Sequence, residues 1–183
     1  MVNILSVLKV LKYGQNFWKL DSLLNEFILQ ITMWAKNITN IEGGLFRTIN
    51  GNADELIAVG RCIKAGFYCS TVENTNGRYD AVIDPGNGKL LRVQIKGTSG
   101  KSIGFKGGGR SGQQISREVA RRDYKYSPKD CDLILGINSN TGECYIIPIS
   151  DIQNFGSSKS LNKLKEYKEN WDLLRKLTKN IKQ

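Results

Sequence analysis

Histidine is absent from the sequence, and its absence narrows the chemistry that the protein can perform. Hydrolases with a serine or cysteine nucleophile and a histidine base are excluded, as are nucleases that bind metal or attack phosphate through an imidazole. A mixed zinc site of cysteine and histidine is excluded as well. Any catalysis must use carboxylates, lysine, tyrosine or a metal ion.

Zinc-binding spacing and long apolar runs are also missing. The cysteines never form a CxxC pair, so we expect four reduced, mostly buried thiols in a cytoplasmic protein: Cys62, Cys69, Cys131 and Cys144. No apolar run approaches the roughly 18 residues of a membrane span. The apolar start of the chain is interrupted by Lys9 and lacks a signal-peptide cleavage site. We therefore expect no membrane partner.

Positive charge is abundant and unevenly placed. The chain has 27 lysines and arginines against 17 aspartates and glutamates. Residues 92–129 hold ten of the basic residues and only two acidic ones, which accounts for eight of the ten net charges. Such a local field suits a polyanion, because each cation that meets a phosphate releases counterions. A basic surface that only keeps the protein soluble is the alternative.

The length of 183 residues fits one domain with an appendage. We assign residues 1–45 to an N-terminal helical extension and residues 46–183 to the main domain. Within the extension, residues 17–36 place apolar side chains at helical spacing. The apolar face of this helix can pack on the main domain, on the preceding apolar stretch or on a second subunit, and the sequence leaves the choice open.

The main domain begins with a pattern of one helix and three strands. Residues 43–51 predict linker and turn, and a helix then begins with Asn52 as its N-cap and stops at Gly66. Three short runs rich in β-branched and aromatic residues predict a meander of strands at 67–72, 78–84 and 90–95.

The second half of the domain is more basic at its start and more apolar at its end. Residues 97–114 hold seven glycines and predict a mobile basic loop, and residues 115–123 predict a short helix. Residues 132–137 and 143–147 predict a second hairpin, which Pro148 should end. A long final helix follows, with one apolar stripe made of Leu164, Tyr167, Trp171, Leu174 and Ile181. This order of elements predicts a mixed α/β or α+β domain.

The second and third predicted strands bring polar side chains together. Residues two apart in a strand share a face, so Gln94 and Lys96 point the same way, opposite to the apolar residues between them. A loop at residues 85–89 places Asp80 directly opposite Gln94. One carboxylate, one amide and one ammonium group then converge.

Each of these residues also has an ordinary structural explanation. Aspartate, glutamine and lysine are common on any half-exposed hairpin. Glu55 fits a capping box with Asn52. However, Glu55 shares a helical stripe with Val59 and Cys62, so it can also point inward, and an inward carboxylate usually has a partner or a metal.

Together these residues resemble a known signature. Glu55 on a helix, Asp80 at the start of a strand and the run from Gln94 to Lys96 at the end of the next strand are similar to the PD-(D/E)xK nuclease family in its QxK variant. That variant occurs in some restriction enzymes and in a cyanobacterial intron-homing endonuclease. The resemblance implies a restriction-endonuclease-like core, with a central four- to five-stranded mixed sheet flanked by helices and an extra N-terminal helical segment.

The resemblance covers residues 50–178 and leaves out residues 1–45. Two positions depart from the family pattern. Gln94 stands where an acidic residue is usual, and Tyr79 stands where the motif has proline.

A metal-dependent DNA endonuclease is the activity that the resemblance implies, with Glu55, Asp80, Gln94 and Lys96 as catalytic residues. The metal would be Mg²⁺, with Mn²⁺ as a substitute, held by Asp80, Glu55 and the carbonyl group of Ile95. Lys96 would orient or polarise the attacking water. Gln94 would offer a neutral oxygen in place of a carboxylate, which favours one tightly held metal ion.

Double-stranded DNA is the expected partner, and the expected outcome is site-specific double-strand cleavage of the homing or restriction type. Two strands are most simply cut by two sites, so we expect a dimer or tetramer. The residues expected to bind DNA are Lys101, Lys106, Arg110, Arg117, Arg121 and Arg122. The alternatives are a Holliday-junction-resolvase-like nuclease and a non-catalytic nucleic-acid-binding module. In the second case the aromatic residues Phe105, Tyr124 and Tyr126 would stack on bases.

Overall fold

The computed structural model describes residues 37–73, 77–86, 88–108 and 124–180. The chain divides into two compact units, residues 1–41 and residues 42–183, and the elements described below belong to the second. The helices predicted at 17–36 and 115–123 lie outside the described residues. Within the described part of the chain, no helix has both the length and the apolar character that crossing a membrane requires.

Helix α3 spans Gly43–Lys64 and begins earlier than predicted. The carboxylate of Glu42 caps it by accepting hydrogen bonds from the backbone N–H groups of Gly44 (2.9 Å) and Leu45 (3.1 Å). The prediction that Asn52 is the N-cap is therefore wrong. A glycine inside a helix costs only about 1 kcal/mol, and no proline interrupts this stretch, so the glycines do not break the helix. The predicted division of the chain at residue 45 falls inside α3 and stays a prediction.

The end of α3 was predicted correctly. The helix stops at Lys64, and Gly66 follows with a φ of 92°, in the left-handed region that favours glycine. This turn directs the chain into the first strand of the sheet.

A mixed sheet of five strands forms the centre of the domain, in the order β1-β2-β3-β7-β8. The pairs are antiparallel except for β3 and β7, which run parallel. The first three strands confirm the predicted meander, and the last two confirm the predicted second hairpin. The bounds are β1 Tyr68–Thr71, β2 Ala81–Asp84, β3 Leu91–Thr98, β7 Leu133–Asn138 and β8 Cys144–Pro148.

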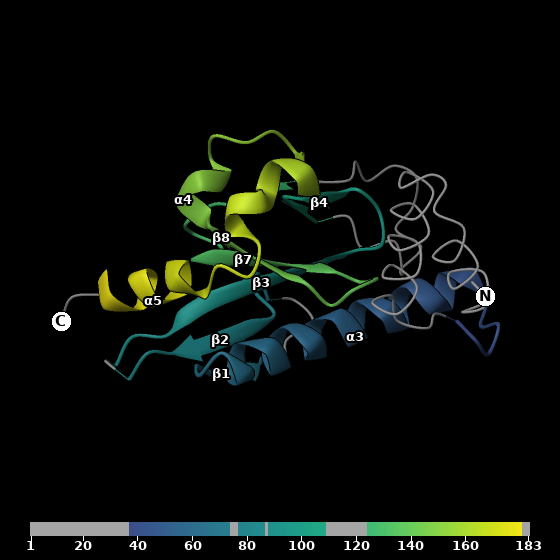
Figure 1. Cartoon of the computed structure of the whole chain (residues 1–183), viewed down its shortest axis with the longest axis horizontal. Helices are drawn as coiled ribbons and strands as arrows, with labels where there is room; N and C mark the ends of the chain where they lie inside the picture. The colour runs from purple at the N-terminus through teal and green to yellow at the C-terminus, as the bar shows by residue number, and fades with distance from the viewer. Residues whose placement is uncertain (1–36, 74–76, 87, 109–123, 181–183) are drawn as a thin grey trace, which may run out of the picture. The chain divides into compact units, whose positions relative to one another are not determined.

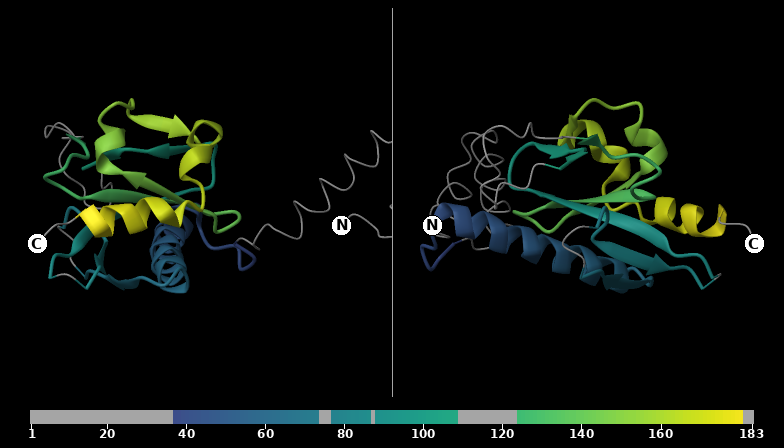
Figure 2. Two further views of the ribbon diagram at one scale, coloured as in Figure 1. Left: turned by 60° about the vertical axis from the view of Figure 1, so that its left-hand side comes forward. Right: turned by 180° about the vertical axis from the view of Figure 1, so that it is seen from behind.

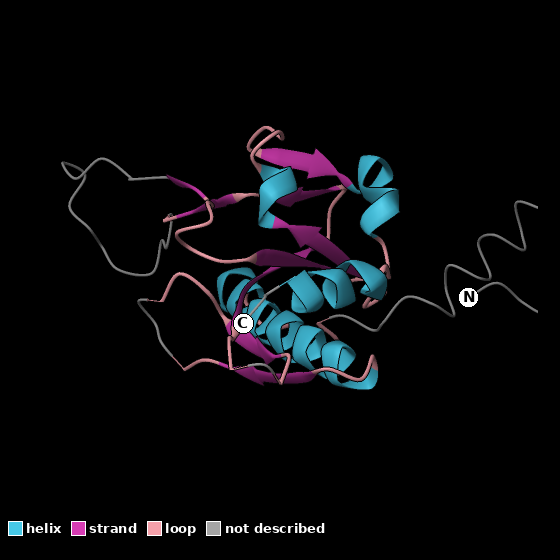
Figure 3. Ribbon diagram, turned by 90° about the vertical axis from the view of Figure 1, so that its left-hand side faces the viewer, coloured by secondary structure: helices cyan, strands magenta, loops and turns pink. Residues whose placement is uncertain are grey.

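Both faces of this sheet are covered, by different kinds of element. Helices α3 and α5 (Trp171–Asn180) pack on one face, which we call the helical face; Figures 1 and 3 show the two helices on the same side of the strands. Figure 2 shows α3 running alongside the sheet. The other face, which we call the site face, is covered by shorter elements: β4 (Ser102–Gly104), β9 (Ser158–Ser160), α4 (Ile149–Ile152) and the 3₁₀ helix η1 (Leu161–Tyr167).

Part of the glycine-rich stretch is ordered into strands, contrary to the prediction of a loop over residues 97–114. β4 pairs with β9, and β5 (Lys106–Gly107) pairs with β6 (Tyr124–Lys125). Ile103 and Phe105 are fully buried between these short strands and the sheet. Both pairing partners lie far along the chain, so local composition gave no sign of them.

The predicted long final helix is also wrong, because four separate elements replace it. α4, β9 and η1 come first, Glu169 adopts a positive φ of 51°, and only then does α5 begin. The predicted single stripe consequently splits between the two faces. Leu164 and Tyr167 are buried on the site face, whereas Leu174 is buried on the helical face.

Candidate active site

The hairpin of β2 and β3 places Asp80 beside Gln94, as predicted. Ala81 pairs with Val93 across the hairpin, and the backbone N–H of Asp80 donates to the carbonyl oxygen of Val93 at 2.8 Å. The Oδ2 atom of Asp80 accepts hydrogen bonds from the backbone N–H of Ile95, at 2.8 Å, and from Nε2 of Gln94. One carboxylate oxygen is therefore held by two donors from β3.

The side-chain amide of Gln94 bridges two oxygen atoms. Its Nε2 donates to Oδ2 of Asp80 and also to the carbonyl oxygen of Ile95, at 3.2 Å. Both of these oxygens can only accept, so hydrogen-bonding chemistry requires the nitrogen of the amide, and not its oxygen, to face them. Gln94 is only 5% exposed, so this arrangement is shielded from water.

Lys96 comes next on the same face of β3 and lies over an aromatic ring. Its Nζ atom is 5.1 Å from the ring centroid of Tyr126, within the range of a cation–π contact. Tyr126 is fixed by its backbone N–H, which donates to the carbonyl oxygen of Phe105 at 3.1 Å, and by an edge-on contact with Tyr124. Burial, together with the nearby charge of Asp80, raises the pKa of Tyr126 well above its ordinary value, which keeps the phenol neutral.

Glu55 lies in the middle of α3 and is partly buried. Its interpretation as a capping-box residue is wrong, because Asn52 lies inside the helix and Glu42 caps it. The hydrogen bonds described above join Asp80, Gln94 and Ile95 and do not include Glu55. The described residues contain no cluster of three or more carboxylate or cysteine side chains that could hold a metal ion by themselves.

The neighbouring carboxylate, Asp54, was missed by the sequence analysis. It is 3% exposed and accepts a 2.6 Å hydrogen bond from the hydroxyl of Ser139. Burial raises the pKa of the Asp54 carboxyl, and the bond from Ser139 acts in the opposite direction. Asp54 also lies so close to Gly97 that a Cβ atom there would collide with its carboxylate. Its spacing of four and eight residues from the buried Ala58 and Cys62 is the signal that could have revealed it.

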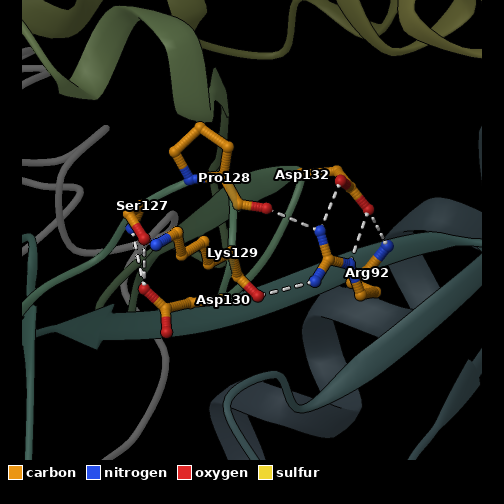
Figure 4. Close-up of polar contacts among 6 residues, drawn as sticks. All are labelled: Arg92, Ser127, Pro128, Lys129, Asp130 and Asp132. Atoms are coloured by element: carbon orange, nitrogen blue, oxygen red, sulfur yellow. Dashed lines mark hydrogen bonds and ion pairs between the residues drawn. The ribbon is translucent and has the colours of Figure 1, made fainter.

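A tight loop from Ser127 to Asp132 lies beside the hairpin (Figure 4). Arg92 holds this loop: its guanidinium donates to the carbonyl oxygens of Pro128 and Lys129, both at 2.8 Å, and forms an ion pair with Asp132 at 2.9 Å. Arg92 belongs to the basic segment 92–129, which was expected to suit a polyanion. In the structure its charge is neutralised within the loop.

Of the residues predicted to bind DNA, Lys101 and Lys106 are exposed. The other four, at positions 110, 117, 121 and 122, lie outside the described residues. Two of the aromatic residues suggested for base stacking, Phe105 and Tyr126, are buried and cannot stack on bases. The third, Tyr124, has one face of its ring covered by the guanidinium of Arg78, 4.2 Å from the ring centroid.

Comparison with known families identifies the class of protein. The sequence matches the PD-(D/E)XK endonuclease family over residues 48–173, so the protein belongs to that family. Membership implies a phosphodiester hydrolase that acts on DNA, and nucleases of this family typically use divalent metal ions.

Among solved structures, the bacterial homing endonuclease I-Ssp6803I is similar to this chain. The TM-score is 0.60 at 20% sequence identity, and the match covers 74% of this chain and 98% of the other. At this identity the likeness concerns the fold, and it confirms the predicted restriction-endonuclease-like core. A comparison with curated proteins finds no match.

Proposed function

We propose that this protein is a site-specific, Mg²⁺-dependent DNA endonuclease that cleaves both strands of a duplex, in the manner of a homing or restriction enzyme. The observation that carries the proposal is the cluster that the Asp80 carboxylate forms with the Gln94 amide and the Ile95 carbonyl group in the middle of β3. Lys96 comes next on the same face of the strand and lies over Tyr126. The likeness to a homing endonuclease fold supports the homing assignment over a junction-resolving one.

The donor set fits a hard divalent cation. Oδ2 of Asp80 and the carbonyl oxygen of Ile95 both lie within hydrogen-bonding distance of one atom, Nε2 of Gln94. A cation placed near that atom would therefore have two oxygen ligands. Rotation of the Gln94 amide by half a turn would present its Oε1 as a third. We propose Glu55 as a further ligand. A bound divalent cation would neutralise charge on the scissile phosphate and lower the pKa of the attacking water.

Gln94 has a second role when no cation is bound. Its N–H group joins Asp80 to the Ile95 carbonyl, so the two oxygens do not face each other unpaired. A glutamate at this position would instead place a second negative charge beside Asp80. The glutamine therefore holds the site in shape before metal binds.

Lys96 is the residue that we propose to act on the attacking water. The ring of Tyr126 lies beneath its Nζ atom and limits the positions that the ammonium group can occupy. We propose that Lys96 orients the water with one N–H and stabilises the charge that develops on the phosphate. Tyr126 is a positioning residue in this scheme, because it acts through Lys96.

The direct test is cleavage in Mg²⁺ of a library of supercoiled plasmids with randomised inserts, so that a target site is present, by the unmutated protein and by Asp80→Ala. We expect the unmutated protein to linearise the plasmids that carry a target site and the variant to lose cleavage, because no remaining side chain replaces the carboxylate. Glu73→Ala, at an exposed position beyond β1, is the matched control and should cleave normally. Full cleavage by Asp80→Ala would reject the proposed site.

If the unmutated protein binds duplex DNA and cleaves none, the non-catalytic binding module becomes the better description. Cleavage that yields only nicked circles would argue against the dimer or tetramer that double-strand cutting predicts. Light scattering with and without DNA measures the assembly independently.

A further inference from the structure

A pocket of about 460 Å³ opens beside the candidate active site. Its lining residues come from the segment before β2, from β6 and from the loop after β6: Arg78, Tyr124, Lys125, Ser127, Lys129 and Asp130. Two connections tie it to the catalytic groups. Arg78 lies two residues before Asp80, so their Cα atoms are at most about 7 Å apart. Tyr124 contacts Tyr126, whose ring lies beneath Lys96.

The pocket is electropositive. Three of its lining side chains are cationic and one is acidic, and the acid is directed into the protein. Asp130 accepts hydrogen bonds from the backbone N–H of Ser127 (3.0 Å) and from its hydroxyl (2.7 Å), and it forms an ion pair with Arg78 at 2.9 Å. With its oxygens used in this way, Asp130 fixes the loop and leaves the surplus positive charge to the pocket.

The walls of the pocket are held in place before any ligand arrives. Arg92 bonds the carbonyl oxygens of Pro128 and Lys129 (Figure 4), which sets the course of the backbone at the pocket's edge. The Nζ atom of Lys125 donates to the carbonyl oxygens of Gln153 (3.1 Å) and Phe155 (2.6 Å), so this lysine contributes charge but is committed to the protein.

Arg78 and Lys129 are the cations placed to meet a ligand. The guanidinium of Arg78 is about half exposed; it lies over the ring of Tyr124 and uses one of its five N–H donors on Asp130. Lys129 is exposed, and only its backbone carbonyl is used by Arg92. Because Arg78 covers a face of Tyr124, that face cannot take a stacked base.

We propose that this pocket binds a backbone phosphate of the DNA strand being cut, next to the scissile phosphate, through Arg78 and Lys129. The proposal rests on the proposed nuclease function and adds a subsite to it. A planar guanidinium matches two oxygens of a phosphate, and a preformed, electropositive pocket close to Asp80 fixes the register of the strand without reading its sequence.

The first experiment measures how DNA affinity depends on salt. A labelled duplex is titrated with protein in EDTA, by fluorescence anisotropy, at several salt concentrations. Lys129→Ala should reduce the slope of log K against log salt by about 0.9, the value for one lost phosphate contact. Lys163→Ala removes an exposed lysine of η1 that does not line the pocket and should leave the slope unchanged.

The second experiment locates the phosphate. After the cleavage position is mapped, single neutral methylphosphonates are placed at the phosphates around it. One substitution next to the scissile bond should weaken binding by the unmutated protein more than binding by Lys129→Ala, because the variant has already lost one of the two cations at that phosphate. Arg78→Lys keeps the charge and loses the planar fork, so it should raise KM with little change in kcat.

The outcomes separate the two claims. A protein that cleaves DNA, but whose salt slope is the same for Lys129→Ala and the control, overturns the pocket and leaves the nuclease function intact. An unmutated protein that neither binds nor cleaves DNA overturns both. Equal sensitivity of the two proteins to every methylphosphonate would place the contact elsewhere and likewise overturn the pocket.

Discussion

The two faces of the central sheet differ in the elements that cover them and in the side chains that they carry, and strand β3 contributes residues to both. On the helical face, Leu91, Val93 and Ile95 pack against α3 and α5 in an apolar core. On the site face, the alternate residues Gln94 and Lys96 meet Asp80 and a pair of tyrosines. Strand β3 thus contributes apolar side chains to the core on one face and the polar groups of the candidate site on the other.

Two buried or partly buried carboxylates sharpen this contrast. Asp54 belongs to α3 and has a hydroxyl from the β7–β8 turn as its partner, at 2.6 Å. Asp80 has a backbone N–H and an amide from β3 as partners. Burial alone therefore does not mark the site. What distinguishes Asp80 is its position beside the Gln94 amide, which also reaches the carbonyl oxygen of Ile95.

The largest expected effect is on the rate of cleavage, from a change on the site face. Lys96→Met keeps an unbranched side chain of similar length without the charge, and we expect cleavage to slow by about 10²- to 10⁴-fold with little change in stability. Single-turnover cleavage and thermal unfolding measure the two quantities. Lys163→Met, on the surface of η1, is the control and should keep the normal rate. A Lys96→Met protein of normal rate would remove lysine from the mechanism.

A matched pair of leucines compares the stabilising contribution of the two faces. Leu174 on the helical face and Leu164 on the site face are both fully buried. Each change to alanine should lower the free energy of unfolding by about 2–5 kcal/mol, measured by denaturant titration. A much smaller loss for Leu164→Ala would mean that the small elements on the site face contribute little to global stability, which would deepen the contrast.

Gly97 tests how closely α3 approaches β3. A Cβ atom there would collide with the Asp54 carboxylate, so Gly97→Ala should destabilise the protein by about 1–3 kcal/mol through overpacking. Gly104→Ala is the control, because a Cβ at Gly104 meets no atom within 4 Å. Similar melting temperatures for the two variants would show that α3 can move away from the sheet at little cost.

The smallest expected effect is the dependence of stability on metal for Gln94→Glu. Without metal, the variant loses the amide donor and places a second carboxylate near Asp80, so its melting temperature in EDTA at pH 8 should fall by a few degrees. Mg²⁺ should restore it, with a larger gain than in the unmutated protein. Without metal, repulsion by Asp80 raises the pKa of the new carboxyl group above its value in the unfolded chain. The free energy of unfolding should therefore be larger at low pH and decrease as the pH rises. Equal gains with Mg²⁺ would argue against Gln94 lying at the metal site.

Local patterns in the sequence were sufficient to predict the meander and the position of Asp80 opposite Gln94. Alternation of polar and apolar residues in 90–95, with a short loop at 85–89, fixed the faces and the register, because side chains in a strand alternate with a period of two. Asp80 beside Gln94 follows from that register alone. The second hairpin and the end of α3 at Gly66 were likewise predicted from residues close to them in the sequence.

The start of α3 and the elements that follow β8 could not be predicted from local patterns. α3 begins at Gly43 because a glutamate caps it and the sheet supports its second half, which the glycines concealed. Leu164 and Leu174 fit one helical stripe in sequence, yet they are buried on opposite faces. One long helix and two separate elements on opposite faces both satisfy this spacing, and only packing against the sheet distinguishes the two arrangements.

The sequence alone was sufficient to exclude histidine-dependent chemistry and to place a carboxylate, an amide and a lysine on adjacent strands. The tertiary structure decided what surrounds those groups. The Gln94 amide joins Asp80 to the Ile95 carbonyl, Tyr126 lies beneath Lys96, and Arg78 and Lys129 meet at one pocket. These contacts join residues distant in the chain, and their energies depend on distance and burial, which exist only once the sheet has formed.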